Sequence, residues 1–171
     1  MKIEAEIEKG KTLYNAIKEF LKMQFPDTFE ESEQYDNCYH IAIYSQDNEN
    51  FAVWFEYDFE NAELIVGHGI NHRHYGKQYG DEISTGFNYF FDLLLSKKRR
   101  TDFFKGSLNF KTNYEIEEKN GTYNSSGGNS IFLYPFWKKT TRNLIEQKAL
   151  IENKKVKLEL EKLRNLMITS L

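Results

Sequence analysis

Three histidines within seven residues are the side chains of this sequence that are best suited to chemistry. His68 lies between Gly67 and Gly69, and His72 and His74 follow it. Imidazole is a common ligand for zinc and similar ions, so the three histidines are candidate metal ligands. A stable zinc site usually needs a further ligand in fixed geometry, and the chain has neither an HExxH segment nor paired cysteines. The pattern therefore favours a structural role, in which the glycines shape the end of a strand and the histidines hydrogen-bond to neighbouring backbone.

Other catalytic signals are weak. Cys38 is the single cysteine of the chain and stands beside a strand-like run, which is typical of a core residue rather than a nucleophile. One cysteine excludes a disulfide framework and fits a reducing, cytosolic setting. The glycines of residues 119–130 lack the spacing and the lysine of a phosphate-binding loop. We therefore expect no catalytic residue and no cofactor, and a binding protein rather than an enzyme.

Charge is distributed unevenly along the chain. No Lys or Arg occurs between Lys22 and Arg73, whereas the same segment contains eleven carboxylates, and cations are in excess after it. If a sheet displays these acids together, its surface attracts cationic partners and repels nucleic acid. The alternative is that charged loops and edge strands serve solubility alone. Trp54 is either an aromatic anchor for a partner or a core residue. The candidate partner-binding residues are Glu30, Glu31, Glu33, Asp36, Asp47, Glu49, Trp54, Glu56, Asp58 and Glu60.

The elements that position these residues can be predicted from periodicity. Alternating apolar residues predict strands over residues 39–44 and 51–58, and a third strand follows a turn at DFENAE, which together indicate an antiparallel meander. Apolar residues at helical spacing predict a helix over about residues 11–24, before Pro26, and another from Asp81 to the basic run Lys97–Arg100. That run fits a solvated helix end better than a nucleic-acid patch. Residues 27–36 and 119–130 are expected to be loops, and 103–110, 114–116 and 131–134 short strands.

The whole pattern predicts an α+β fold. We expect an antiparallel sheet of about five or six strands, with helices packed on one face, in a single domain covering residues 1–171. The absence of Gly and Pro from residue 137 to residue 171 predicts a long C-terminal helix there, which packs on the domain or projects as an arm for a partner or a second copy. The predicted core residues are Phe20, Ile41, Val53, Phe55, Val66, Phe87, Phe91 and Leu94.

The middle of the chain resembles a known class of protein. The order of an aromatic strand, the run AELIVGHG, the run HRHY and an aromatic amphipathic helix is similar to that of small bacterial α+β proteins. In size and in the acidity of its sheet region, the chain resembles immunity proteins of contact-dependent growth inhibition and related polymorphic toxin systems. The resemblance implies an inhibitor that binds the toxic C-terminal domain of a cognate effector in the cytoplasm. Many such effectors are nucleases with basic clefts, which would suit an acidic surface.

Two other readings stay open at this stage. One is a metal-dependent enzyme centred on His68, His72 and His74. The other is a scaffold that oligomerises, for example as a homodimer, through the C-terminal helix. We expect no nucleic-acid partner and no membrane association. The start of the chain lacks the apolar run of a signal peptide, and no uncharged apolar run approaches the ~20 residues that a membrane span needs.

Overall fold

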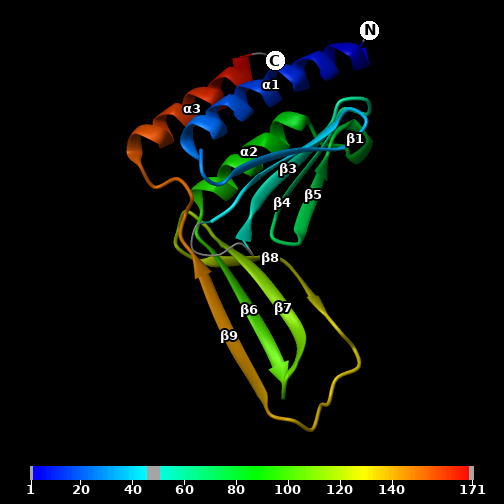
Figure 1. Ribbon diagram of the computed structural model, residues 1–171, viewed down its shortest axis with the longest axis vertical. Coiled ribbons are helices and arrows are strands. Elements are labelled where there is room, and N and C mark those ends of the chain that lie inside the picture. The colour runs from blue at the N-terminus through cyan, green and yellow to red at the C-terminus, as the bar shows by residue number, and fades with distance from the viewer. Residues whose placement is uncertain (1, 46–50, 170–171) are drawn as a thin grey trace. The chain divides into compact units, whose positions relative to one another are not determined.

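The chain divides into two compact units. The computed structural model describes residues 2–45 and 51–169, with side chains for residues 7–45 and 51–165 (Figure 1). Unit 1 comprises Met1–Leu95 and Ile151–Leu171, and unit 2 comprises Ser96–Leu150. The sequence predicted one domain from the length of 171 residues. The α+β class with antiparallel sheets and a C-terminal helix is confirmed.

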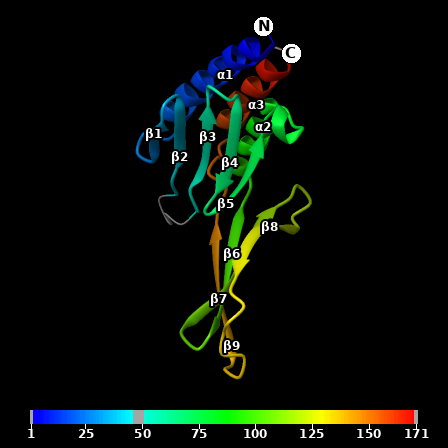
Figure 2. The same cartoon turned by 90° about the vertical axis from the view of Figure 1, so that its right-hand side faces the viewer.

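Unit 1 is a five-stranded antiparallel meander with helices on one side (Figure 2). The strands lie in the order of the sequence, as expected for strands joined by short turns. A short 3₁₀ helix, η2 (Lys77–Tyr79), follows the last strand. The remaining elements are α1 (Lys2–Gln24), β1 (Phe29–Tyr35), β2 (Cys38–Ile43), β3 (Val53–Asp58), β4 (Glu63–His68), β5 (Asn71–Tyr75), α2 (Ile83–Leu95) and α3 (Lys154–Thr169).

The core lies between the sheet and the helices. The ring of Phe55 on β3 makes edge contacts with Tyr14 of α1 and with Phe87 and Phe90 of α2, at centroid distances of 5.8, 5.5 and 4.9 Å. All eight predicted core residues are buried, so the strand phase predicted from alternation is confirmed. Edge-to-face aromatic pairs of this kind contribute about 0.5–1.5 kcal/mol each beyond burial.

Helix α1 is longer than the sequence predicted. It begins at Lys2 and passes through Gly10, whereas the sequence predicts a start near residue 11. A Cβ atom built at Gly10 would lie 1.7 Å from the Tyr57 hydroxyl oxygen, so only glycine lets the helix lie this close to the sheet. The cost of a mid-helix glycine is about 0.5–1 kcal/mol. The acidic segment predicted to be a loop is also structured, because β1 pairs with β2 from Phe29 to Tyr35.

The C-terminal helix is shorter than predicted and packs on its own unit. Residues 140–147 form a strand, and α3 begins only at Lys154. Arg164 pairs with Asp92 of α2 at 2.7 Å, and its guanidinium lies 5.6 Å from the Phe91 ring. Leu160 is fully buried. The described part of α3 is therefore a layer of unit 1 and not a projecting arm.

Unit 2 is a four-stranded antiparallel sheet in the order β8-β7-β6-β9. Its strands are β6 (Lys98–Lys105), β7 (Leu108–Glu117), β8 (Tyr123–Ser130) and β9 (Thr140–Gln147). The basic run Lys97–Arg100 is not a helix end, since Lys98 opens β6. The polar segment predicted as a loop is β8, whose backbone pairs with β7 and whose Gly128 lies so close to Thr112 that a Cβ would be 2.3 Å from its carbonyl oxygen. Residues 131–134 are not a buried strand, because Phe132 and Leu133 are almost fully exposed.

Helix length and polarity bear on membrane insertion. Among the helices that the structure describes, none is both long and apolar enough to cross a membrane.

Candidate functional site: the open face of the five-stranded sheet

The face of the unit 1 sheet that points away from the helices carries the candidate site. Register fixes which side chains share this face, because alternate residues of a strand point to opposite sides. Phe55 points to the helices, so its neighbours Trp54 and Glu56 point the other way. We call this surface the open face. Its outward side chains that are not fully buried include Glu30 and Ser32 of β1, His40 of β2, Trp54 and Glu56 of β3, Glu63 and Ile65 of β4, and His72 and His74 of β5.

Trp54 lies flat across the neighbouring strand β4. Its partner in the register is Gly67, and a Cβ atom there would lie 2.5 Å from the indole carbon Cζ2. The indole Nε1 donates a hydrogen bond to the Gly69 carbonyl oxygen at 2.9 Å. The missing side chain at Gly67 therefore leaves the room that the Trp54 ring occupies. The indole is partly exposed, and its hydrogen bond to Gly69 and its contact over Gly67 orient it before any partner arrives.

A row of aromatic and imidazole rings crosses the open face. The Trp54 ring lies 5.5 Å from the ring of His40 and 6.0 Å from that of His72, which in turn lies 5.2 Å from His74. Tyr79 of η2 extends the row, with its ring 5.2 Å from His74. Rings joined in this way form a continuous ridge from β2 to η2.

Glu63 anchors one end of this ridge. One of its carboxylate oxygens, Oε1, lies 2.7 Å from His74 Nδ1 and accepts a hydrogen bond from the Tyr79 hydroxyl at 2.8 Å. The hydrogen bond to the carboxylate raises the pKa of the Tyr79 hydroxyl, so this group stays protonated and continues to donate. The sequence did not single out Glu63, His40 or Tyr79. Register alone could have identified the first two, since they fall on the same side as Trp54.

No positive charge offsets the carboxylates of this face. Among the described strand residues of the open face there is no Lys or Arg. Arg73 of β5 points to the helices, where its guanidinium lies 4.8 Å from the Tyr89 ring. Burial lowers the pKa of His40, although Glu56 and Glu30 act in the opposite direction, so His40 is neutral at pH 7. The open face is therefore acidic.

The predicted acidic residues fall into different places. Glu30 is exposed on the open face and Glu56 is partly exposed there. Asp36 and Glu60 lie on two adjoining turns at one end of the sheet, where Asn37 donates a hydrogen bond to Glu60 at 3.0 Å. Glu33 is exposed on the edge strand β1, on the helix side by register. Asp47 and Glu49 lie outside the described residues.

Two of the predicted acidic residues have partners within the chain. Asp58 is 7% exposed, and its carboxylate accepts hydrogen bonds from the backbone of Glu60 and Asn61, which closes the β3–β4 turn. Glu31 faces α1, where it accepts a hydrogen bond from the Tyr14 hydroxyl at 2.8 Å and pairs with Lys18. Burial acts against ionisation of Glu31, but these bonds and charges hold its pKa below the ordinary value. Both carboxylates serve the fold.

The three histidines do not form one site. His68 is 1% exposed and shares the helix-covered face with Val53, its register partner, whereas His72 and His74 lie on the open face. Within the described part of the chain, no group of three His, Cys, Asp or Glu side chains is arranged to hold a metal ion. The proposed metal ligands therefore lie on opposite faces of the sheet, His68 on one and His72 and His74 on the other.

Cys38 is buried, as predicted for a core residue. Burial raises the pKa of its thiol to about 12, and the nearby carboxylates of Glu56 and Asp58 act in the same direction. Because the thiolate is the reactive form, this thiol is inert near neutral pH.

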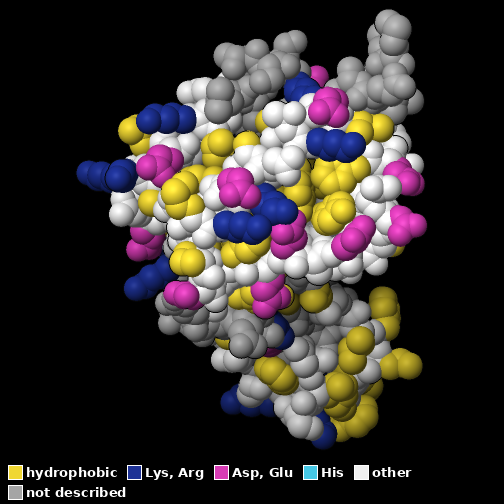
Figure 3. All heavy atoms as spheres, turned by 45° about the horizontal axis from the view of Figure 1, so that its top comes forward, with side chains coloured by type: hydrophobic (Ala, Val, Ile, Leu, Met, Phe, Trp, Pro, Cys, Tyr) yellow, Lys and Arg dark blue, Asp and Glu magenta, His cyan; other side chains and the backbone are white. Residues whose placement is uncertain are grey.

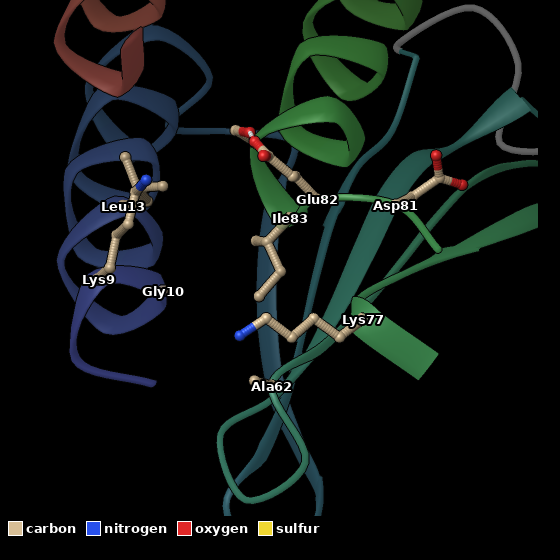
Figure 4. Close-up of a pocket in the computed structure, with 9 residues that line it drawn as sticks. Lys9, Gly10, Leu13, Ala62, Lys77, Asp81, Glu82 and Ile83 are labelled. Carbon is tan, nitrogen blue, oxygen red and sulfur yellow. Dashed lines mark hydrogen bonds between the residues drawn. The ribbon is translucent and has the colours of Figure 1, made fainter. Parts of the chain in front are cut away.

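A pocket lies on the other side of unit 1, between the start of α2 and the helix α1 (Figure 4). Its volume is about 160 Å³, below the ~300 Å³ at which pockets for small ligands usually begin. Lys9 and Leu13 of α1, Lys77 of η2 and Glu82 of the α2 lead-in line it. It includes none of the rings of the open face, so the two features are separate.

The arrangement suits binding better than catalysis. An imidazole oriented by a carboxylate, as in His74 and Glu63, can in principle move a proton. Among the described residues of the open face, however, there is no activated nucleophile beside it. Aromatic residues such as Trp are enriched at the centres of protein-binding surfaces, and charged residues lie mainly at their polar rims. Comparison of the chain with known protein families, with curated proteins and with solved structures found no match.

Proposed function

We propose that this chain is a binding protein that recognises a basic protein partner through the open face of its five-stranded sheet. The observation that carries the proposal is the pre-oriented Trp54 on a face whose described strand residues include Glu30, Glu56 and Glu63 but no Lys or Arg. The resemblance to immunity proteins supports a specific partner, the toxic domain of a cognate effector, which the chain would neutralise in the cytoplasm.

The spacing of the charges suits a basic surface. Glu56 is two residues from Trp54 on the same strand, a distance of about 7 Å, and Glu30 is two strands away in the same row, about 10 Å. Cations of the partner that pair with these carboxylates would surround the indole. Burying an aromatic side chain inside a charged rim is the arrangement in which Trp contributes most to affinity.

The area of the sheet indicates that the partner extends beyond it. Five strands at ~4.8 Å spacing and about 20 Å long give a face of roughly 400 Å². A stable interface buries about 800 Å² on each partner. The turns with the exposed residues Asp36 and Glu60, at one end of the sheet, are an acidic surface that could supply the rest. We therefore place the proposed interface on the open face and this end of the sheet, and leave out Glu31 and Asp58.

Site-specific photo-crosslinking in cells tests the proposal. A photoreactive amino acid at His72, which is exposed on the open face, should capture one predominant protein with a basic domain. The matched control is the same amino acid at Asn15, which is exposed on α1. Capture of the same proteins from both positions, or none at His72, would contradict the proposal.

A further inference from the structure

One end of unit 2 combines exposed apolar side chains with cations. We call residues 103–114 and 128–145 the tip; they comprise the β6–β7 hairpin end and the connection from β8 to β9. Figure 3 shows hydrophobic side chains gathered on this unit, with Lys and Arg beside them. The exposed large hydrophobic residues of the tip are Leu108, Ile131, Phe132, Leu133, Phe136, Trp137 and Leu144.

The most exposed of these residues lie in the connection between β8 and β9. Phe132 and Leu133 are 99% and 92% exposed, and Phe136 and Trp137 are 75% and 73% exposed. Fully exposed aromatic and aliphatic residues in consecutive positions have no role in the core of this unit. A contiguous apolar surface of this kind marks an interaction site.

The loop is held in place by the neighbouring hairpin. Lys105 Nζ donates hydrogen bonds to the carbonyl oxygens of Lys138 at 2.9 Å and Phe136 at 3.4 Å. The Tyr134 ring packs on Phe110 at a centroid distance of 4.5 Å, and the Ile131 backbone bonds to the same residue. The exposed side chains are thus presented by an ordered loop, which reduces the entropy that docking would cost.

The charges of the tip have one sign. Its sequence contains no Asp or Glu. The residue before it on β6, Asp102, is 4% exposed and accepts hydrogen bonds from Thr112 and Arg100. The tip contains five cations: Lys105, Lys111, Lys138, Lys139 and Arg142.

We infer that the tip docks on an anionic lipid surface, a peripheral contact that departs from the expectation, drawn from the sequence, of no membrane association. A bilayer accepts convex apolar groups such as Phe132 and Leu133 without a matching pocket, and Trp137 suits the boundary between hydrocarbon and water. The lysines and the arginine can keep their charges among anionic headgroups while their stems lie along the apolar layer. Single-stranded nucleic acid fits less well, because Ile131 and Leu133 cannot stack on bases. This inference is independent of the function proposed for the open face.

Fluorescence of Trp137 is the direct test. The chain has two tryptophans, so a Trp54→Phe variant of the full chain reports on Trp137 alone. Vesicles of phosphatidylcholine with about 30% phosphatidylserine should shift its emission to the blue and sediment with the protein. Phosphatidylcholine vesicles should bind it at least tenfold more weakly, and salt at about 1 M, where the screening length is ~3 Å, should release it.

Two variants and a control locate the contact. Phe132→Ser with Leu133→Ser should weaken partition at least about tenfold through the lost apolar burial. Lys138→Gln with Lys139→Gln should weaken it about 25-fold, at about fivefold for each cation. The control is Lys119→Gln with Lys148→Gln, exposed lysines outside the tip, which should change partition less than about threefold. Circular dichroism and thermal melts establish that each variant is folded.

Several outcomes would overturn the inference. It fails if the folded protein does not partition into the anionic vesicles, or if the tip and control variants partition alike. Binding to a single-stranded oligonucleotide that needs Phe132 and Leu133, without vesicle binding, would assign the tip to nucleic acid instead. A concentration-dependent dimer lost in the same variant, again without vesicle binding, would assign it to a second copy of the chain.

Discussion

Replacing Gly67 by Ala should disrupt the open face at its centre. The new Cβ would lie 2.5 Å from the Trp54 indole and 2.6 Å from the backbone oxygen of Asn71, so the indole must leave its place or β5 must move. Overpacking of this kind costs about 1–3 kcal/mol, and the lost Trp54 hydrogen bond to Gly69 about 1 kcal/mol more. Alanine also restricts the unfolded chain more than glycine does, which offsets about 0.4–1 kcal/mol of the lost stability. The net loss should be about 2 kcal/mol, or roughly 4–8 °C in melting temperature.

The assay is made in a Trp137→Phe background, so that Trp54 is the single tryptophan. Gly67→Ala should lower the midpoint of urea unfolding and shift the Trp54 emission to the red as the indole enters water. A double-mutant cycle with Trp54→Ala separates the causes, because removal of the indole should make Gly67→Ala less costly by about 1 kcal/mol or more. Unchanged stability and unchanged emission in Gly67→Ala would refute the packing described for Trp54.

Two further predictions concern the fold around the site. Glu31→Gln should lower the free energy of unfolding by about 1–2 kcal/mol at pH 7, since the bonds from Tyr14 and Lys18 to the carboxylate are lost. The folded-state pKa of Glu31 lies below its ordinary value of 4.5, so this stabilisation is present above pH 4.5 and is lost as the pH falls through the folded pKa. The difference in unfolding free energy between the wild type and Glu31→Gln, measured by urea unfolding, should therefore be smaller at about pH 3 than at pH 7. An equal difference at both pH values would contradict this assignment. His68→Ala should lower the free energy of unfolding by about 1–3 kcal/mol, because the residue is 1% exposed. His72 is exposed, so His72→Ala should change the same free energy by less than about 0.5 kcal/mol. Equal melting temperatures of the two variants would argue against the placement of the two histidines on opposite faces.

The part of the fold that follows from alternation was predictable. Ile41, Val53, Phe55 and Val66 stand at alternate positions of short strand-like runs, and all four are fully buried. The same alternation predicted that Trp54 and Phe55 point to opposite faces of the sheet. It could not show whether a second layer covers Trp54, because both faces of a central strand can be buried. In the structure the helices lie on the other face, and the indole stays partly exposed.

The part held together by backbone pairing was not predictable from side chains. The segment containing Gly127 and Gly128 has the composition of a loop, yet it is the strand β8, because β7 offers a partner along its whole length. Residues 140–147 lack Gly and Pro and were predicted as helix, yet they pair with β6. Pairing between distant segments depends on tertiary context, which a local pattern does not record.

Only part of the candidate site was predictable, because the rest depends on pairing between strands. Acidity and Trp54 could be read from the sequence, because the segment lacks cations. The spacing of His68 from His72 and His74 suggested one cluster, but a turn at Gly69 separates them and the pairing of His68 with Val53 places it among the core side chains. The bond of Glu63 to His74 joins two strands and has no local signature.

The most direct test of the central claim is the association rate with the partner captured at His72. Glu30→Lys with Glu56→Lys reverses the charge of the open face, and Glu19→Lys with Glu152→Lys makes the same charge change at exposed positions elsewhere. At low salt the first pair should slow association at least about tenfold, the second pair much less, and the difference should vanish near 1 M salt, where charges are screened beyond ~3 Å. Equal effects of both pairs, or no dependence on salt, would contradict binding through the open face.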